Sequence, residues 1–271
     1  MLIASHLPAP SHIVMPARLP YRYKLASLKS GALWTGGRPY VDREEILWIG
    51  LKLRYIIGQR KVSDWNSITL MTSIVLAGGK GERLGRNKLS ETVGGRTLLQ
   101  RVIDTLGLVS DQIVIVIARG QSEPIISSTT ETKITTDLYP DKGALGGIYT
   151  GLASSASCHN LVVAADMPFL SPSLLGYLMR LSADYDVVMP RVSGEIEPLH
   201  AVYSRNCLAP IQHQLDEGTL KIRDFLQRVR VRYVEEAEIE GFDPKRLSFF
   251  NINTSADLRL AKSLLEETGE P

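Results

Sequence analysis

The feature that most constrains the fold of this chain is a regular alternation of short apolar runs and helix-like segments, which begins at residue 72. The apolar runs are rich in Val and Ile, which is typical of strands that are buried on both faces. The expected strands are SIVLA (73–77), QIVIVIA (112–118), TKITT (132–136), NLVVAA (160–165), YDVVMP (185–190) and PLHAVYS (198–204). Strands that alternate with helices in this way predict an α/β domain with a mostly parallel sheet and helices on both of its sides.

Segments with helical spacing lie between these runs. The clearest are residues 97–109, a segment that begins at Ser171, and residues 254–267. Pro172 is well placed for a first helical position, where its missing N–H costs nothing. Thr254 and Asp257 have the spacing of a capping box, in which each side chain bonds the backbone of the other.

Residues 1–70 differ from the rest of the chain. They hold all three tryptophans and show no clear period beyond a short alternation over residues 51–55. Met71 stands directly before the first strand of the regular pattern. We therefore expect residues 1–70 to be a poorly ordered N-terminal extension and residues 71–271 to form the domain. Two interpretations of the extension stay open: translation normally begins at Met71, or the segment is an arm for a partner or a membrane surface.

The net charge of +2 hides an uneven distribution. Residues 1–70 hold 10 Lys and Arg against 4 Asp and Glu, and the remainder holds 21 against 25. Residues 71–271 therefore carry no basic excess of the kind that nucleic-acid binding requires. Pro8 and Pro10 interrupt the apolar start, which makes it a poor signal peptide. The apolar window at 46–57 is too short and too charged to span a bilayer, so we expect a cytoplasmic protein without membrane or nucleic-acid partners.

A glycine-rich loop, Gly78 to Arg86, follows the first expected strand. In open α/β sheets ligands bind beyond the carboxyl ends of the strands, and glycines let backbone N–H groups approach an anion. The loop matches neither a P-loop nor the dinucleotide fingerprint. It is strongly basic, with four cations within nine residues: Lys80, Arg83, Arg86 and Lys88. A phosphate-binding loop is expected, and a tight turn or a solvated basic loop is the alternative.

Two aspartates follow other strands at the same expected edge. Asp166 ends the apolar run LVVAA, where a carboxylate is costly unless it is paired or binds a metal. Mg²⁺ typically uses one or two carboxylates together with substrate phosphates. Asp137 ends another strand and precedes the glycines at 143–147. A helix-capping or turn-forming role for Asp166 and close helix packing for the glycines are the alternatives.

No nucleophile with a neighbouring base is visible in the sequence. Cys158 and Cys207 belong to no metal or redox motif. His200 lies inside a strand-like run, so we expect a core histidine with its hydrogen bonds satisfied. The constellation suits a reaction in which positioning and charge do most of the catalysis, and nucleotidyl transfer is such a reaction.

These residues also carry a family resemblance. LAGGKGERLGRNK (76–88) resembles the nucleotidyltransferase signature LAGG-x-x-x-R-[ML]-G-x-x-K. The loop from Asp137 to Gly147, the AADMPF step (164–169) and NINTSADL (251–258) are similar to further motifs of the molybdenum cofactor guanylyltransferase (MobA) family. The resemblance covers about 200 of the 271 residues and leaves residues 1–70 unmatched.

The resemblance implies a three-layer α/β/α, Rossmann-like nucleotidyltransferase domain that transfers GMP from GTP to molybdopterin and releases pyrophosphate. It implies Mg²⁺ held by Asp166, which would also lie at the α-phosphate. The backbone of Leu76, Ala77 and Gly78 would line the nucleotide. Lys88 would contact its phosphates and act with Asp166 in catalysis, and Asp137 would bind the nucleotide.

Further implications concern the acceptor and the base. Asn251 and Asn253 match a motif near the pterin. Some family members carry a nucleotide-contacting asparagine late in the second strand, where this chain has Val116-Ile117-Ala118, so strict use of GTP is an open question.

Rival functions remain at this point. The nearest is a cytidylyltransferase for the same cofactor, or an enzyme that acts on a sugar or alcohol phosphate. A degenerate module that binds a nucleotide without turnover is a rival from another class. The basic extension could also dock a molybdoenzyme or its chaperone.

Overall fold

The computed structural model describes residues 34–35, 38–39, 70–78 and 90–268. The chain divides into two compact units, Met1–Asn66 and Ser67–Pro271, and each is described by itself.

The described part of the first unit is a pair of two-residue strands. β1 (Trp34–Thr35) pairs antiparallel with β2 (Arg38–Pro39). The alternation over residues 51–55 lies outside the described residues. The interpretation of residues 1–70 as an extension therefore stays a prediction.

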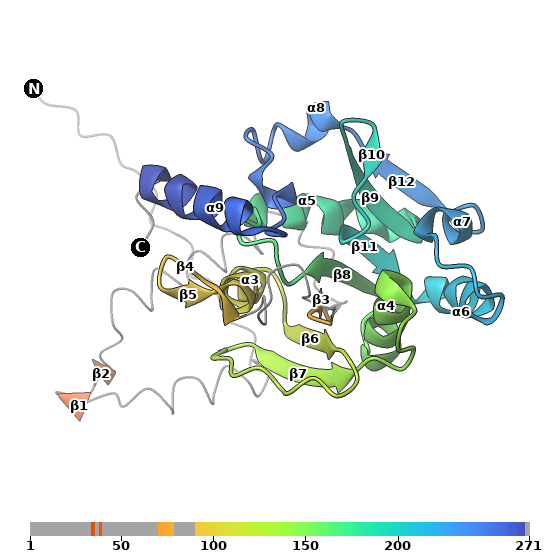
Figure 1. Cartoon of the computed structure of the whole chain (residues 1–271), viewed down its shortest axis with the longest axis horizontal. Helices are drawn as coiled ribbons and strands as arrows, with labels where there is room; N and C mark the ends of the chain where they lie inside the picture. The colour runs from red at the N-terminus through yellow and green to blue at the C-terminus, as the bar shows by residue number, and fades with distance from the viewer. Residues whose placement is uncertain (1–33, 36–37, 40–69, 79–89, 269–271) are drawn as a thin grey trace, which may run out of the picture. The chain divides into compact units, whose positions relative to one another are not determined.

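An eight-stranded sheet forms the centre of the second unit (Figure 1). The strand order is β10-β9-β11-β8-β3-β6-β7, and β12 also pairs with β9. The strands are β3 (Thr72–Leu76), β6 (Gln112–Ile117), β7 (Glu131–Thr136), β8 (His159–Ala164), β9 (Val187–Val192), β10 (Glu195–Ile196), β11 (His200–Ser204) and β12 (Val231–Val234). β8, β3, β6 and β7 are mutually parallel, and so are β9 and β12. The predicted mostly parallel sheet is confirmed.

Two strands run against this direction. β11 is antiparallel to both β8 and β9, and β10 forms a hairpin with β9. Ser193 and Gly194 turn that hairpin with positive φ angles of 51° and 79°. The apolar sequence of β11 could not reveal its direction, because a strand buried on both faces has the same composition either way.

Helices cover both faces of the sheet (Figure 1). α4 (Gly143–Ser154) and α6 (Leu208–Asp216) pack with α7 (Ile222–Leu226) over a core that includes Ile74, Val116 and Tyr203. The other helices are α3 (Leu98–Gly107), α5 (Pro172–Leu181), α8 (Glu236–Ile239) and α9 (Ser255–Thr268). α9 packs on a smaller cluster with β4 (Thr92–Val93), which pairs with β5 (Arg96–Thr97). Within the described residues, no helix combines the length and apolar character needed to cross a membrane.

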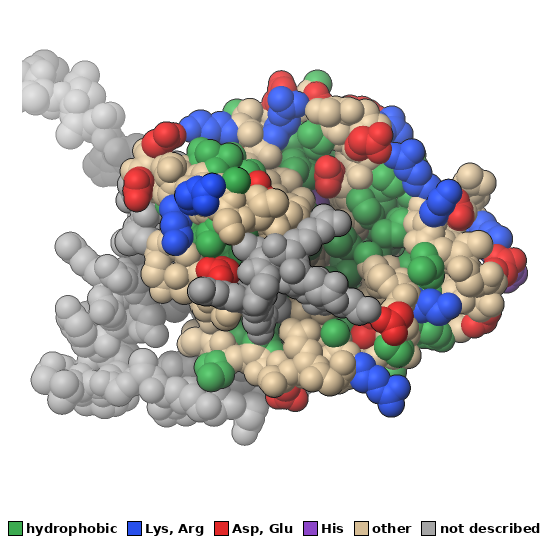
Figure 2. Space-filling view, viewed as in Figure 1, with side chains coloured by type: hydrophobic (Ala, Val, Ile, Leu, Met, Phe, Trp, Pro, Cys, Tyr) green, Lys and Arg blue, Asp and Glu red, His purple; other side chains and the backbone are tan. Residues whose placement is uncertain are grey.

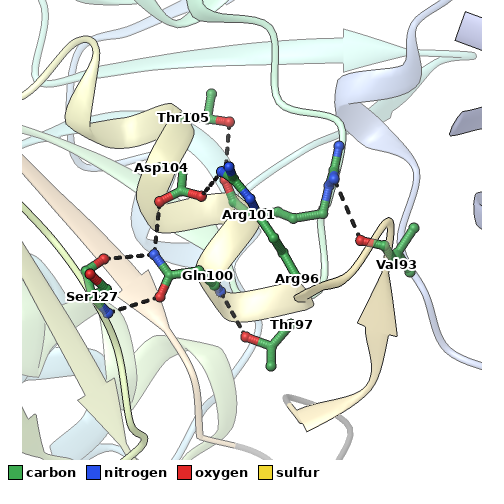
Figure 3. Close-up of polar contacts among 8 residues, drawn as sticks. All are labelled: Val93, Arg96, Thr97, Gln100, Arg101, Asp104, Thr105 and Ser127. Atoms are coloured by element: carbon green, nitrogen blue, oxygen red, sulfur yellow. Dashed lines mark hydrogen bonds and ion pairs between the residues drawn. The ribbon is translucent and has the colours of Figure 1, made fainter. Parts of the chain in front are cut away.

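Side-chain caps fix where three helices begin. The Thr97 hydroxyl accepts a hydrogen bond from the Gln100 N–H at 3.1 Å and starts α3 (Figure 3). Ser171 caps α5 through the Leu174 N–H, and Pro172 occupies the first turn, as expected. The Asp257 N–H donates to the Thr254 hydroxyl at 3.2 Å, and the Thr254 N–H donates to the Asp257 carboxylate at 2.7 Å. These two bonds confirm the predicted capping box before α9.

α4 lies unusually close to the central strand because glycines face it. A Cβ on Gly147 would lie 3.2 Å from the Leu76 side chain, and one on Gly151 would lie 2.3 Å from Ile74 Cγ2. Ile74 is fully buried, so it has no room to move aside. At these two positions the glycines serve close packing, which was the alternative stated for Gly147 from the sequence and was not considered for Gly151.

This contact gives a stability prediction. Gly151→Ala should lower the free energy of unfolding by about 1–3 kcal/mol, because the added methyl overpacks a closed core. Chemical denaturation would measure the change. Gly241→Ala is the matched control, since its added Cβ would meet Glu238 O at an ordinary 3.4 Å. Equal stabilities for the two variants would contradict the packing argument.

Candidate active site at the carboxyl edge of the sheet

Five of the six predicted site residues lie along one edge of the sheet. Leu76 is in register with Val116 of β6 and with Ala164 of β8, and Ile117 is in register with Thr136 of β7. Because these strands are parallel, the residues that follow them meet at the same edge. The predicted residues on it are Leu76, Ala77, Gly78, Asp137 and Asp166. Lys88 lies outside the described residues, with the rest of the loop 79–89.

At the carboxyl end of β3, the backbone is hydrogen-bonded to its neighbour β6 and to the segments that follow β8 and β6. Leu76 O accepts a hydrogen bond from Ala165 N at 3.1 Å, and Ala77 N donates to Val116 O at 2.8 Å. Ala77 O accepts from the side-chain amide of Gln121 at 3.1 Å. These three polar groups are therefore hydrogen-bonded inside the protein, and Gly78 is the first exposed residue after β3.

Gly78 is required by its surroundings. A Cβ there would lie 2.9 Å from the backbone nitrogen of Ala118. Because the clashing atom belongs to the backbone, no side-chain rotation could relieve the clash. The chain can therefore leave the sheet beside the end of β6 only with glycine at this position.

Asp137 uses one carboxylate oxygen to build the turn that leads to α4. Its Oδ1 accepts a hydrogen bond from Tyr139 N at 3.0 Å and shares the Thr150 hydroxyl proton with Gly146 O, each oxygen being 2.9 Å from that hydroxyl. The Thr150 hydroxyl also accepts from Leu138 N at 3.0 Å, and Asp137 N donates to Ile117 O at 2.8 Å. Among the described residues no hydrogen bond to Oδ2 is found, and the two bonds to Oδ1 fix the direction in which Oδ2 points. Thr150 carried no sequence signal, because it lies within α4, 13 residues after Asp137.

Asp166 follows β8 at the same edge, and its Oδ1 atom is buried. Its main-chain oxygen accepts a hydrogen bond from Ile252 N at 3.0 Å. The segment that carries Asn251 and Asn253 therefore lies against Asp166. Asn251 donates its side-chain N–H to Phe249 O at 3.2 Å, which holds the start of this segment in a turn.

With this geometry in view, comparison with known proteins assigns the chain to a family. Residues 73–234 match the MobA-like NTP transferase domain. The chain belongs to that family. Both the predicted family and the predicted fold are confirmed.

Named relatives agree over most of their length. A probable molybdenum cofactor guanylyltransferase of Pelotomaculum thermopropionicum is 36% identical over 197 residues, which are 73% of this chain and 94% of the relative. A molybdenum cofactor guanylyltransferase of Desulfosudis oleivorans is 36% identical over 198 residues, 72% of this chain and 96% of the relative. The crystal structure of molybdopterin-guanine dinucleotide biosynthesis protein A from Archaeoglobus fulgidus matches with a TM-score of 0.62 and 28% identity, and covers 73% of this chain and 100% of that chain.

Within this MobA-like domain, Val116 cannot contact a nucleotide through its side chain. It is 2% exposed and belongs to the core beneath α4. The asparagine contact that some family members make from this strand is therefore absent at this position. The side chain that does reach the end of the strand is that of Gln121, which the sequence analysis did not single out.

The carboxyl edge of the sheet suits a metal ion whose coordination shell is completed by the substrate. Among the described residues, no group of three or more His, Cys, Asp or Glu side chains gathers into a metal-binding cluster. Mg²⁺ is commonly held by one or two carboxylates plus phosphate oxygens and water. A single carboxylate, Asp166, with one oxygen buried beside the strand ends, fits that type of site.

A separate pocket of about 660 Å³ lies where β9, β10, β12 and α7 meet. Ile196 and Val231 contribute apolar walls, and Arg191 and Arg223 contribute charge. The Arg191 guanidinium lies 4.2 Å from the centroid of the Tyr233 ring. Figure 2 shows hydrophobic side chains in a hollow over this part of the domain, with Lys and Arg side chains along its outer edge.

His200 differs from its expected state. It is fully buried on β11, as predicted for a core histidine. Among the described residues neither ring nitrogen makes a hydrogen bond of ordinary geometry, and the Ser248 backbone is its one weak polar contact. The expectation of satisfied hydrogen bonds is wrong. The ring instead lies 4.7 Å from the Phe249 ring, between centroids. Burial lowers the pKa of His200 from 6.5 to about 4, and Asp243 and the Ser248 backbone oppose that shift only in part.

The buried neutral ring predicts a pH dependence of stability. Between pH 6.5 and about 4 the unfolded chain binds a proton on His200 that the folded chain does not, so stability falls as the pH falls through this window. The loss should be on the order of 3 kcal/mol and should level off below about pH 4. Urea denaturation from pH 7 to 4 should show a flatter profile for His200→Leu than for the unaltered protein. Parallel profiles would contradict a neutral buried ring.

Proposed function

We propose that this chain transfers GMP from GTP to molybdopterin, releasing pyrophosphate and forming a molybdopterin guanine dinucleotide. One observation carries the proposal: Gly78, Asp137 and Asp166 lie together on the carboxyl edge of a domain whose guanylyltransferase relatives match over 94–96% of their length. The rivals named from the sequence then become outcomes of the test.

The nucleotide is assigned to the β3, β6 and β7 part of the edge. The backbone at Leu76, Ala77 and Gly78 would line the base and sugar, with Gly78 as the exposed member. Asp137 would bind the nucleotide through Oδ2, the carboxylate oxygen that the turn does not use. Lys88 would contact the phosphates, where a charge-assisted hydrogen bond is stronger than a neutral one.

Asp166 would hold Mg²⁺ together with phosphate oxygens of the substrate. The bound cation would supply neutralisation of the charge on the phosphates. The chain itself would bind and orient both substrates, so that an oxygen of the acceptor phosphate attacks the α-phosphate of GTP. The bond between the α- and β-phosphates then breaks and pyrophosphate leaves.

No covalent enzyme intermediate is part of this mechanism. Burial raises the pKa of the Cys207 thiol to about 12, and a thiol in that state is a poor nucleophile. Cys158 is exposed and precedes β8, at the opposite end of that strand from Asp166.

The acceptor is assigned to the other half of the edge. The pocket beside β9 and β12 combines apolar walls with Tyr233 and with Arg191 and Arg223, which are ion-paired with Glu235 and Glu195. Such a lining suits a flat ring with polar substituents. Strands lie about 4.8 Å apart, so this pocket is within reach of an extended molecule whose phosphate lies at the end of β8. Asn251 and Asn253 approach Asp166 from the α9 side and would contact the same acceptor.

Residues 1–70 enter the proposal only as expectations. Translation from Met71 would give the domain alone, whereas the full chain would carry a basic arm for a molybdoenzyme or its chaperone. A cytoplasmic location also stays a prediction.

The first functional prediction concerns Asp166. Asp166→Asn should lower kcat by at least about 100-fold, because a neutral amide cannot replace a carboxylate beside a cation and phosphates. Steady-state pyrophosphate release in saturating Mg²⁺ would measure the loss. Asp184→Asn, an exposed change before β9 at the opposite edge, should leave the rate unchanged. A near-normal rate for Asp166→Asn would remove it from the metal site.

The test of the function itself is a nucleotide panel. Pyrophosphate release should be measured with molybdopterin, Mg²⁺ and each of GTP, CTP, ATP and UTP. We expect release with GTP alone. Release with CTP instead would make the protein a cytidylyltransferase on the same scaffold, and nucleotide binding without any release would indicate a degenerate binding module.

A further inference from the structure

The segment after β6 turns back on itself at once. Gln121 N donates a hydrogen bond to Ala118 O at 3.1 Å, which closes a four-residue turn. Gly120 supplies the positive φ angle, 80°, that this turn needs at its third position. The turn places the Gln121 side chain over the end of the strand that it follows.

The amide of Gln121 joins two strand ends. Its Oε1 accepts a hydrogen bond from Ala118 N at 3.1 Å, and its Nε2 donates to Ala77 O at 3.1 Å. The last backbone bond between β3 and β6 is the one from Ala77 N to Val116 O. The amide therefore continues the pairing of the two strands past the point where their own backbones separate.

Gly78 depends on that continuation. It is the residue directly after Ala77, and its α-carbon passes so close to Ala118 that a Cβ would lie 2.9 Å from the Ala118 nitrogen. Without the amide, Ala77 O and Ala118 N would both be hydrogen-bonded to water. The distance between the Ala77 and Ala118 backbones would then no longer be fixed. The start of the glycine loop would then sample several positions.

We propose that Gln121 is a positioning residue for the nucleotide, which it serves by holding the Ala77–Gly78 backbone against the end of β6. The inference rests on the proposed function, since it takes this backbone to be the surface on which the base lies. It also explains how a base site can be built here although Val116 is buried.

The deciding variants are Gln121→Ala and Gln121→Glu. The first removes both hydrogen bonds, and the second keeps an acceptor for Ala118 but turns a carboxylate oxygen toward Ala77 O, where a donor is needed. Each should weaken nucleotide binding about 5–10-fold, which is the loss expected from one or two hydrogen bonds. KM for GTP should rise by the same factor while kcat stays within about twofold, because Gln121 touches no reacting atom.

Gln100, in α3, offers a control at the other end of the same connecting segment, and its Nε2 donates to Asp104 Oδ1 at 2.7 Å. Its amide also bridges to backbone: Oε1 accepts from Ser127 N at 2.9 Å and Nε2 donates to Ser127 O at 2.6 Å (Figure 3). It anchors the far end of the segment to α3, away from the carboxyl edge. Gln100→Ala should therefore match Gln121→Ala in its effect on the thermal midpoint and leave nucleotide affinity unchanged.

The experiment measures GTP binding by calorimetry in the presence of Mg²⁺, and pyrophosphate release, for the full chain and the three variants. Weaker binding in both Gln121 variants but not in Gln100→Ala supports the inference, whether or not turnover is seen. Unchanged GTP affinity in Gln121→Ala, with the unaltered protein active, overturns the inference and leaves the proposed function standing. A full chain that neither binds nor turns over GTP overturns both.

Discussion

The central position of β3 is the constraint on which the rest of this domain depends. Its five residues are hydrogen-bonded on both sides, to β6 and to β8, in one parallel register. That register brings the residues after three different strands to a common edge. α4 can cover β3 only because Gly147 and Gly151 remove the side chains that would collide with it. The site therefore follows from the packing of one short strand.

The residues at this edge serve the fold, and in the proposed function they also bind the nucleotide. One carboxylate oxygen of Asp137 is hydrogen-bonded within its own turn, and both backbone polar groups of Ala77 are hydrogen-bonded to β6 and the turn after it. The polar groups that the proposal assigns to the substrate are consequently fixed in direction before it binds. Such preorganisation lowers the cost of binding, because fewer groups must be ordered when the ligand enters.

The sequence was informative wherever a local rule decides the structure. The apolar runs predicted six strands, β3, β6, β7, β8, β9 and β11, to within two residues at each end, and the short strands β4, β5 and β10 were not predicted. Pro172 and the Thr254–Asp257 pair marked two helix starts. Contacts between distant segments were not readable. The direction of β11, the pairing of β12 with β9, and the short helices α6 to α8 depend on which surfaces meet in three dimensions.

The same limit applies to the site. The three strand-end positions could be predicted, because parallel strands must end at one edge. The bridge from Gln121 to Ala77 spans 44 positions in the sequence and has no motif. His200 was placed correctly in the core, but its neighbours there, the Phe249 ring and the Ser248 backbone, come from a distant segment that its own strand does not reveal.

The two amide anchors also divide the segment between β6 and β7 into fixed ends and a free middle. Gln121 holds one end and Ser127 is held at the other, while the side chain of Ile125 is 100% exposed. A change of length between the anchors would be absorbed there without reaching β3. The stretch from Ser122 to Ile126 is thus the natural place in this domain to insert a reporter peptide or a fluorophore attachment site next to the substrate edge.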